Sequence, residues 1–307
     1  MISEIFTAGV FAAMIRLATP YLFASIGEMF GQRSGLLNLG VDGIMLMGAF
    51  FGFYGVLMTG SVVVGLIAAL VVGFLLGLAM AFISVTLKAE QGISGIGMYL
   101  FGLGMSELLF QKWVGTPQSI SGFPRIYFPV LTDIPVIGEI FFNHNLLVYM
   151  AFALVPISAY ILNRTPFGLS IRAVGQNPQA ADAMGVNVNR VRYATAIIGG
   201  VLAGAAGASL SIALLNVFQQ NVTGGLGFIA VALVYFGRWK PYGVLVGALL
   251  FSFVNALQLQ ISAIGIEVPT EFAVMAPYVI TIIALVFASR QTEKPDALTK
   301  PFERGEA

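Results

Sequence analysis

The hydrophobic and polar positions of the chain divide it into long apolar stretches joined by short polar connections. The apolar stretches cover residues 6–26, 38–58, 62–87, 92–112, 145–163, 193–214, 225–237, 241–261 and 271–289. Most of them are close to the ~20 residues that an α-helix needs to cross a bilayer. The pattern predicts an all-α fold, a polytopic membrane helix bundle with about nine transmembrane segments, in a range of about eight to ten. Residues 1–290 would form a single transmembrane domain.

Two of the apolar stretches open with a glycine-rich kink. They are residues 34–52 (SGLLNLGVDGIMLMGAFFG) and 223–237 (TGGLGFIAVALVYFG). In the predicted topology the spans that precede them run in opposite directions, as expected of an inverted repeat whose broken helices flank a central pathway. The match is loose, so a chance likeness stays open beside the repeat. Residues 225–237 are too short to cross alone and are expected to form a broken or re-entrant helix.

Glycines four residues apart recur in the spans. The pairs are Gly48 with Gly52, Gly73 with Gly77, Gly200 with Gly204, and Gly243 with Gly247. Small residues at this spacing let helix backbones approach closely in lipid. They predict tight packing and give no indication of a substrate.

Composition agrees with a membrane bundle. The chain is 58% hydrophobic and 9% charged, with a mean hydropathy of +0.91, whereas soluble domains carry about 25% charged residues. The absence of cysteine excludes disulfides and thiolate chemistry, and the single histidine, His144, cannot build a histidine metal site. We therefore expect no metal. The net charge of +1 gives no indication of a nucleic-acid partner. The N-terminus lacks a basic region and is expected to enter a first span rather than a signal peptide.

The distribution of lysine and arginine predicts the orientation. With nine spans, one face receives Arg33, Lys88, Arg164, Arg172, Arg190, Arg192, Arg238, Lys240, Arg290, Lys294, Lys300 and Arg304. The other face receives Lys112 and Arg125, and Arg16 lies within the first span. Because cytoplasmic loops are enriched in lysine and arginine, the first face should be cytoplasmic. The C-terminal tail 291–307 would be inside, the N-terminus outside, and the longest outside loop would be 113–144.

The sequence lacks the motifs of an enzyme or a self-powered pump. It has no phosphate-binding loop of the G-x-x-x-x-G-K-[ST] type, and no Ser-His-Asp, HExxH or carboxylate-dyad pattern. Ionisable residues within the spans are few, chiefly Arg16, Asp42 and Glu107, with Glu28 near an end. Ion-coupled carriers usually show paired groups there. The scarcity of such groups argues against self-powered coupling, and we expect a protein that is not an enzyme and binds no cofactor of its own.

One polar segment, residues 170–194, has the signals of a short helix between two spans. Asn177 is a favoured N-cap, Pro178 suits the first helical position, and Gly185 suits the left-handed residue that ends a helix. A helix of about two turns is too short to be stable alone and must pack on something. Its alanines suit a groove better than a lipid surface. A connector whose arginines only set the topology is the competing interpretation.

Three motifs carry a resemblance to a known family. "GQNPQAADAMGV" resembles the cytoplasmic coupling motif of ABC-transporter permeases, with Ala180, Ala181 and Gly185 at the matching positions. "RAVGQNPQAA" and "RSGLLNLGVDGIMLMGAF" are similar to the branched-chain amino acid and ribose permease superfamily and its simple-sugar and nucleoside subfamily. "TGGLGFIAVALVYFGRWKPYGVLVGALLF" resembles the second-half motif of that subfamily. Loop 113–144 and the residues after Arg290 have no match, and Asp182 stands where a small or basic residue is usual.

The resemblance implies a transmembrane permease subunit of a binding-protein-dependent ABC importer, with nucleosides as the first-choice cargo, in a prokaryotic cytoplasmic membrane. It implies three partners: a second permease subunit in a heterodimer, with a homodimer as the fallback, a cytoplasmic ABC ATPase with two cassettes, and an extracytoplasmic substrate-binding lipoprotein. ATP would be used by the ATPase alone. The coupling helix would lie within 170–190, and Arg172 and Arg190 would meet acidic cassette residues. The expected coupling residues are Arg172, Gly175, Gln176, Asn177, Pro178, Ala180, Ala181, Gly185 and Arg190.

Polar and aromatic residues in the spans are candidates for the substrate path, because burying a polar group without a partner is costly. They are Asn38, Asp42, Phe218, Gln219, Gln220, Asn221, Phe228, Asn255 and Gln258, with Phe251 as a further aromatic. An interhelical hydrogen bond or ordinary packing is the alternative for each. Loop 113–144 would be a platform for the binding protein, a lid or a plain connection.

Other functions stay open beside the nucleoside importer. They are a simple-sugar ABC importer, an ion-coupled secondary transporter with Asp42 as the coupling carboxylate, and a membrane scaffold or integral enzyme.

Overall fold

The computed structural model describes residues 7–129, 131–264, 275, 279 and 294–304. Its regular structure in these residues is helical, apart from the isolated bridges Ser119–Val217 and Arg125–Asn145. The helices are α2 (Ala8–Arg33), α3 (Val41–Thr59), α4 (Val62–Ala81), α5 (Gln91–Trp113), α6 (Ile137–Phe141), α7 (Leu146–Arg164), α8 (Pro166–Gln176), α9 (Pro178–Ala183), α10 (Val188–Ser209), α11 (Leu226–Phe236) and α12 (Pro241–Ile264). The π-helical turns η1 (Phe82–Thr86) and η2 (Leu210–Leu214) extend α4 and α10.

Seven helices in the described ranges are long and apolar enough to cross a membrane. They correspond to seven of the nine predicted spans, and α11 matches the predicted short segment 225–237. The ninth, 271–289, lies outside the described residues except at positions 275 and 279. The predicted all-α membrane bundle is therefore confirmed.

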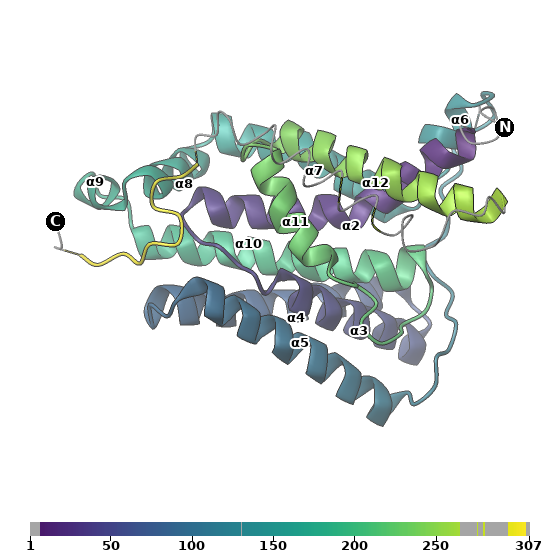
Figure 1. Ribbon diagram of the computed structural model, residues 1–307, viewed down its shortest axis with the longest axis horizontal. Helices are drawn as coiled ribbons and strands as arrows, with labels where there is room; N and C mark the ends of the chain where they lie inside the picture. The colour runs from purple at the N-terminus through teal and green to yellow at the C-terminus, as the bar shows by residue number, and fades with distance from the viewer. Residues whose placement is uncertain (1–6, 130, 265–274, 276–278, 280–293, 305–307) are drawn as a thin grey trace.

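Two of the three most buried helices, α2 and α10, lie in the middle of the bundle, and the third, α3, packs against α10. In Figure 1, α2 and α10 run lengthwise between a layer of α3, α4 and α5 and a layer of α7 and α12. Most residues in the apolar segments of α2 and α10 are buried, whereas most of those in α4 and α5 are not. An apolar exposed surface of this kind suits contact with lipid or another membrane subunit.

The glycine pairs bring α3, α4 and α10 into close contact. A Cβ on Gly48 would lie 2.6 Å from the carbonyl oxygen of Gly204, and one on Gly73 would lie 2.4 Å from that of Gly200. No real Cβ contact is that short, so only glycine permits these backbone approaches. The structure thus supports the packing role predicted for these residues.

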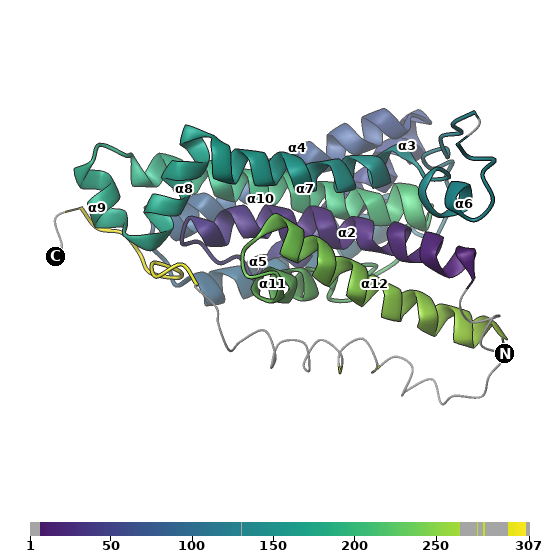
Figure 2. The same cartoon turned by 90° about the horizontal axis from the view of Figure 1, so that it is seen from above.

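α11 is too short to span the bundle. It has 11 residues, and it begins after Gly225, which has a left-handed φ of +89°. In Figure 1, α11 crosses the long axis of the bundle steeply, and in Figure 2 it is seen nearly end-on. This confirms that residues 225–237 form a short broken segment rather than a full span.

The two ends of the bundle differ. Figure 2 shows α8, α9 and the segment 294–304 at one end, and α6 with the start of α2 at the opposite end. We call the first the α9 end. Its helix boundaries differ from the predicted ones: α2 runs to Arg33 and α10 begins at Val188. Gln32 near the end of α2 is buried and hydrogen-bonded within the bundle, and the side chain of Asn187 caps the start of α10 by accepting from the N–H of Arg190.

Candidate functional site

α9 has the cap geometry that its sequence predicts. The side-chain Oδ1 of Asn177 accepts a hydrogen bond of 2.9 Å from the backbone N–H of Ala180. Pro178 occupies the first turn, and Gly185, with a φ of +86°, ends the helix in the left-handed region. The backbone N–H of Gly185 donates to the carbonyl oxygen of Asp182 at 2.9 Å. The chain therefore forms a short helix with fixed ends between α8 and α10.

α8 holds α9 against the rest of the bundle. Its N-terminus is capped by Thr165, whose hydroxyl oxygen accepts from the N–H of Gly168 at 3.1 Å. At its other end, a Cβ on Gly175 would fall 1.9 Å from the carbonyl oxygen of Arg33. Gly175 therefore lets α8 lie directly on the end of α2. The sequence did not predict α8, because its apolar residues, among them Ile171 and Val174, form only a short stripe that is buried on one side.

The predicted coupling residues divide into two faces. Those exposed at the α9 end are Gln176, Asn177, Ala180, Gly185 and Arg190. Those buried against the chain itself are Gly175, Pro178 and Ala181, and Ala181 is only 5% exposed. Arg172 is half-buried. A partner that docks on α9 would thus meet Ala180, while Ala181 packs into the core.

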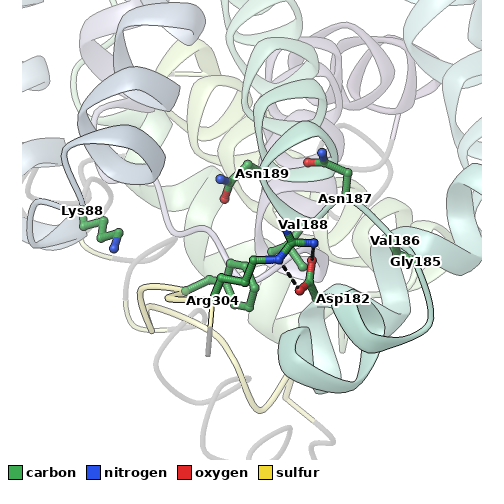
Figure 3. A pocket seen from close by; sticks show the side chains of 9 residues that line it. Lys88, Asp182, Gly185, Val186, Asn187, Val188, Asn189 and Arg304 are labelled. Carbon is green, nitrogen blue, oxygen red and sulfur yellow. Dashed lines mark hydrogen bonds and ion pairs between the residues drawn. The ribbon is translucent and has the colours of Figure 1, made fainter. Parts of the chain in front are cut away.

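The structure adds a neighbour to α9 that sequence reasoning missed. Arg304 forms an ion pair of 2.9 Å with Asp182, and both line a hollow beside α9, drawn in Figure 3. In the sequence, Asp182 stands out only as a departure from the usual motif. The only signal in the sequence was that the charged C-terminal tail has no match in the family motifs. That signal could not indicate that Arg304 contacts Asp182.

Asp42 joins the two glycine-rich motifs at the centre of the bundle. Its Oδ1 accepts a hydrogen bond of 2.7 Å from the backbone N–H of Gly227, and its Oδ2 accepts one of 2.9 Å from the hydroxyl of Thr223. The side chain is fully buried. Asp42 lies in the first turn of α3 and meets the first turn of α11. A carboxylate at helix N-termini is favourable because free N–H groups and the helix dipole both stabilise it.

A second buried polar chain lies beside this junction, and the sequence did not predict it. The indole N–H of Trp239 donates to Gln32 at 2.8 Å, and the amide of Gln32 donates to Glu28 at 2.9 Å. Glu28 also accepts from the backbone N–H of Asn38 at 3.1 Å. These bonds fix the turn after α11 and the connection between α2 and α3. Asn38 thus helps to hold the connection between α2 and α3 in place beside Asp42.

The aromatic candidates lie in two different environments. Phe218 is completely buried and contacts Phe50, with ring centroids 5.5 Å apart, and Phe110, at 5.3 Å. In this conformation the ring of Phe218 packs against other aromatic rings and is not open to a solute. Phe228 on α11 is 37% exposed, and its ring lies 5.0 Å from that of Tyr99 on α5 in an edge-to-face arrangement. Tyr99 was not predicted. The third aromatic candidate, Phe251, is buried against Tyr21.

The remaining polar candidates are not brought into one site. Gln219, Gln220 and Asn221 are exposed in the loop before α11, while Asn255 and Gln258 are half-buried on α12. Of the predicted path residues, Phe228 lies on the short helix α11, and Asp42 hydrogen-bonds to its first turn through Gly227. A path along α11 would therefore be lined by the loop before it and by Phe228 with Tyr99.

The opposite end of the bundle carries loop 113–144 and the single histidine. One ring nitrogen of His144, Nε2, lies 2.7 Å from the carbonyl oxygen of Ile140. Burial lowers the pKa of His144, and the positive charges of Arg16 and Arg125 lower the pKa further. The backbone N–H of Ile120 and Phe123 donate to Asn216 and Ile212. The loop is thereby fixed to the end of α10.

Comparison with known proteins gives one consistent result. Residues 10–285 match the family model described as "Branched-chain amino acid transport system / permease component". The chain is 39% identical to the "Putative glucose ABC transporter permease protein" of Haloferax volcanii, with 97% of this chain and 98% of that protein covered. It is 35% identical to the guanosine ABC transporter permease protein NupQ of Bacillus subtilis, with 95% and 96% covered.

A further relative is the nucleoside ABC transporter permease protein NupC of Lactococcus lactis, which is 36% identical with 93% of this chain and 94% of that protein covered. No solved structure matches the chain. The bundle, its short α11 and the full-length similarity agree. The chain belongs to the branched-chain amino acid transport permease family, in the branch that contains sugar and nucleoside ABC transporter permeases.

Proposed function

We propose that this permease imports nucleosides by alternating access, driven by a separate ATPase that acts on α9. The observation that carries the proposal is the exposed face of α9, a short helix with fixed ends between two spans. A capped helix transmits an applied movement to the bundle better than a loop, because its backbone hydrogen bonds keep it rigid. α9 is followed directly by α10, which packs along α2, α3 and α4 at the centre of the bundle.

The α9 end faces the cytoplasm in this proposal. α2 and α7 run toward it and end in Arg33 and Arg164, Lys88 follows η1 there, and Arg190 lies at the start of α10. Lys300 and Arg304 come from the tail. At the opposite end lie Lys112 and Arg125. This distribution of lysine and arginine supports a cytoplasmic C-terminus and an extracytoplasmic N-terminus, since positive residues concentrate in cytoplasmic loops.

A second, different permease subunit completes the pathway. The chain is 35% identical to NupQ and 28% identical to a second guanosine permease of Bacillus subtilis, NupP, in which it covers 80% of the length. The same holds for NupC and NupB of Lactococcus lactis, at 36% and 27%. Such pairs of unequal similarity favour a heterodimer. An ATPase with two cassettes and a substrate-binding lipoprotein complete the importer.

The cargo is a nucleoside in our first hypothesis. Two of the relatives above are named for guanosine or nucleosides, and the exposed ring of Phe228 beside Tyr99 offers a face on which a planar base could stack. The relative named for glucose keeps a sugar as the second candidate.

Reconstitution in liposomes tests the proposal. Uptake of radiolabelled guanosine, cytidine and glucose should be measured with both permeases, the ATPase and the lipoprotein, and again with each component left out. We expect nucleoside uptake that requires ATP and all four components. Uptake of glucose without uptake of either nucleoside would identify a sugar as the cargo. Uptake by this chain without ATP or partners would establish a secondary transporter instead.

A further inference from the structure

The segment 294–304 lies along the α9 end and is fixed there by its backbone. The N–H of Ala297 donates to the carbonyl oxygen of Gly175 at 2.9 Å, and the N–H of Thr299 donates to that of Gly35 at 3.0 Å. Ala297 is only 3% exposed. Leu298 and Phe302 pack against the hydrophobic core. We call residues 294–304 the tail strap.

Two ion pairs fix the end of the tail strap. Glu303 lies 2.6 Å from the ammonium group of Lys88, which follows α4 and η1. Arg304 lies 2.9 Å from Asp182 of α9 through its Nε, and a second nitrogen bonds the other carboxylate oxygen at 3.3 Å. The strap therefore links α9 to the connection after α4 and to the connection after α2.

α9 and the tail strap together enclose two hollows. One, of about 250 Å³, lies between the N-terminal part of α9 and the strap; its lining includes Gln176, Gln179 and Lys300. The other, of about 360 Å³, lies between the C-terminal end of α9, the start of α10 and the strap. Figure 3 shows Arg304 bonded to Asp182 on one side of this second hollow, with Lys88 on the other side.

The charges of this surface indicate an acidic partner. The carboxylates of Asp182 and Glu303 are held in the two ion pairs, and the strap carries one further exposed carboxylate, that of Asp296. Arg190 and Lys300 are exposed, and in the described part of the chain neither has an ion pair. Unpaired exposed cations attract a surface that carries carboxylates.

We infer that the tail strap and α9 form one composite docking surface for the ATPase subunit of the importer. The inference rests on the proposed function and extends it to residues 294–304. The strap is continuous with the exposed face of α9, and the two hollows lie where protruding side chains of the ATPase would enter. Movement of the ATPase would then reach the bundle at three places: α10 through α9, the α2–α3 connection through Thr299, and the α4–α5 connection through Lys88.

Cross-linking tests the docking surface directly, because the chain contains no cysteine. The variants Met184→Cys at the C-cap of α9, Lys300→Cys on the strap and Met58→Cys at the opposite end each place one thiol at an exposed position. They are treated with a short thiol-to-amine cross-linker in membranes that contain the complete importer. We expect adducts with the ATPase from Met184→Cys and Lys300→Cys, and none from Met58→Cys.

The outcomes separate the two proposals. An adduct from Met184→Cys without one from Lys300→Cys overturns the composite surface and leaves the role of α9 intact. No adduct from either variant, in an importer that is assembled and active, overturns the role of α9 as well. An ATPase adduct from Met58→Cys would place the ATPase at the opposite end of the bundle and would overturn both proposals.

A charge exchange tests the ion pair at the end of the strap. Arg304→Glu should lower the adduct yield of Lys300→Cys about two- to fivefold, since an exposed ion pair contributes modestly. The added substitution Asp182→Lys should restore it, and Arg164→Ala, at an exposed arginine of the same end, should leave it unchanged. An unchanged yield in Arg304→Glu would show that the pair does not hold the strap.

Discussion

The carboxylate of Asp42 accepts a 2.7 Å hydrogen bond from the backbone N–H of Gly227, 185 residues further along the chain. With the bond from Thr223, it connects the first turn of α3 to the first turn of α11. The glycine is required there, because a Cβ on Gly227 would lie 2.3 Å from the backbone nitrogen of Asp42. The carboxylate is fully buried and hydrogen-bonded, which favours a role in holding the two motifs together over a role as a coupling carboxylate.

Asp42→Ala should destabilise the permease by ~1–3 kcal/mol, because it leaves the N–H of Gly227 and the hydroxyl of Thr223 buried without an acceptor. Asp42→Asn keeps one carbonyl oxygen and should lose less. Thermal unfolding in detergent, followed by fluorescence of the two tryptophans, measures both. Asp133→Ala removes an exposed carboxylate that bonds Tyr127 and should change the unfolding temperature little. Equal losses for Asp42→Ala and Asp133→Ala would contradict the role of the junction.

Gly73→Ala should destabilise the bundle by ~1–3 kcal/mol, since the new methyl group would overlap the carbonyl oxygen of Gly200. Gly97→Ala is the matched control in α5, where a Cβ meets nothing within 4 Å. That change should be neutral or slightly stabilising, because alanine favours helix over glycine. The same thermal assay compares them. A stable Gly73→Ala variant would mean that α4 and α10 do not approach as closely as described.

The two aromatic candidates should respond in opposite ways. Phe218→Ala removes a fully buried ring from contact with Phe50 and should cost ~3–5 kcal/mol of stability. Phe228→Ala removes a ring that is 37% exposed, so it should cost much less stability than Phe218→Ala while it lowers nucleoside uptake. Unfolding temperature and uptake by the reconstituted importer are measured on both. Wild-type uptake by Phe228→Ala would remove this residue from the substrate path.

The single histidine gives a pH-dependent prediction for loop 113–144. Because burial lowers the pKa of His144, the folded chain favours the neutral imidazole, whereas the unfolded chain titrates near pH 6.5. The stability from this difference is complete above about pH 6.5 and is lost as the pH falls through the lowered pKa. NMR of histidine-labelled protein should show a pKa below 6.5. His144→Gln should remove the acid-induced rise in hydrogen exchange of the loop. A pKa at or above 6.5 would contradict the described burial.

The sequence predicted the spans well because apolar length is a local property. It could not place the polar residues that the bundle buries. The predicted first span stops at residue 26, before Glu28 and Gln32, yet Asn38 bonds Glu28 and the distant Trp239 bonds Gln32. Asp42 was a candidate for the substrate path because its partner, Gly227, is not visible in a local pattern.

The same limit applies to α9. Its caps were predictable because Asn177, Pro178 and Gly185 act within a few residues of one another. Which alanine faces outward depends on the core beneath the helix, and the structure places Ala181 inward and Ala180 outward. The strap contact between Arg304 and Asp182 joins residues 122 apart, so neither motif nor periodicity could indicate it.

The most direct test of the central claim, that an ATPase drives this permease through α9, is ATP-dependent uptake by the reconstituted importer carrying Ala180→Trp. The residue is exposed, so the variant should fold with an unchanged unfolding temperature. It should lose at least about tenfold in ATPase binding and uptake, because a bulky ring obstructs the docking face, a cost of ~1.4 kcal/mol or more. Wild-type ATPase binding and uptake by a correctly folded Ala180→Trp importer would contradict the account.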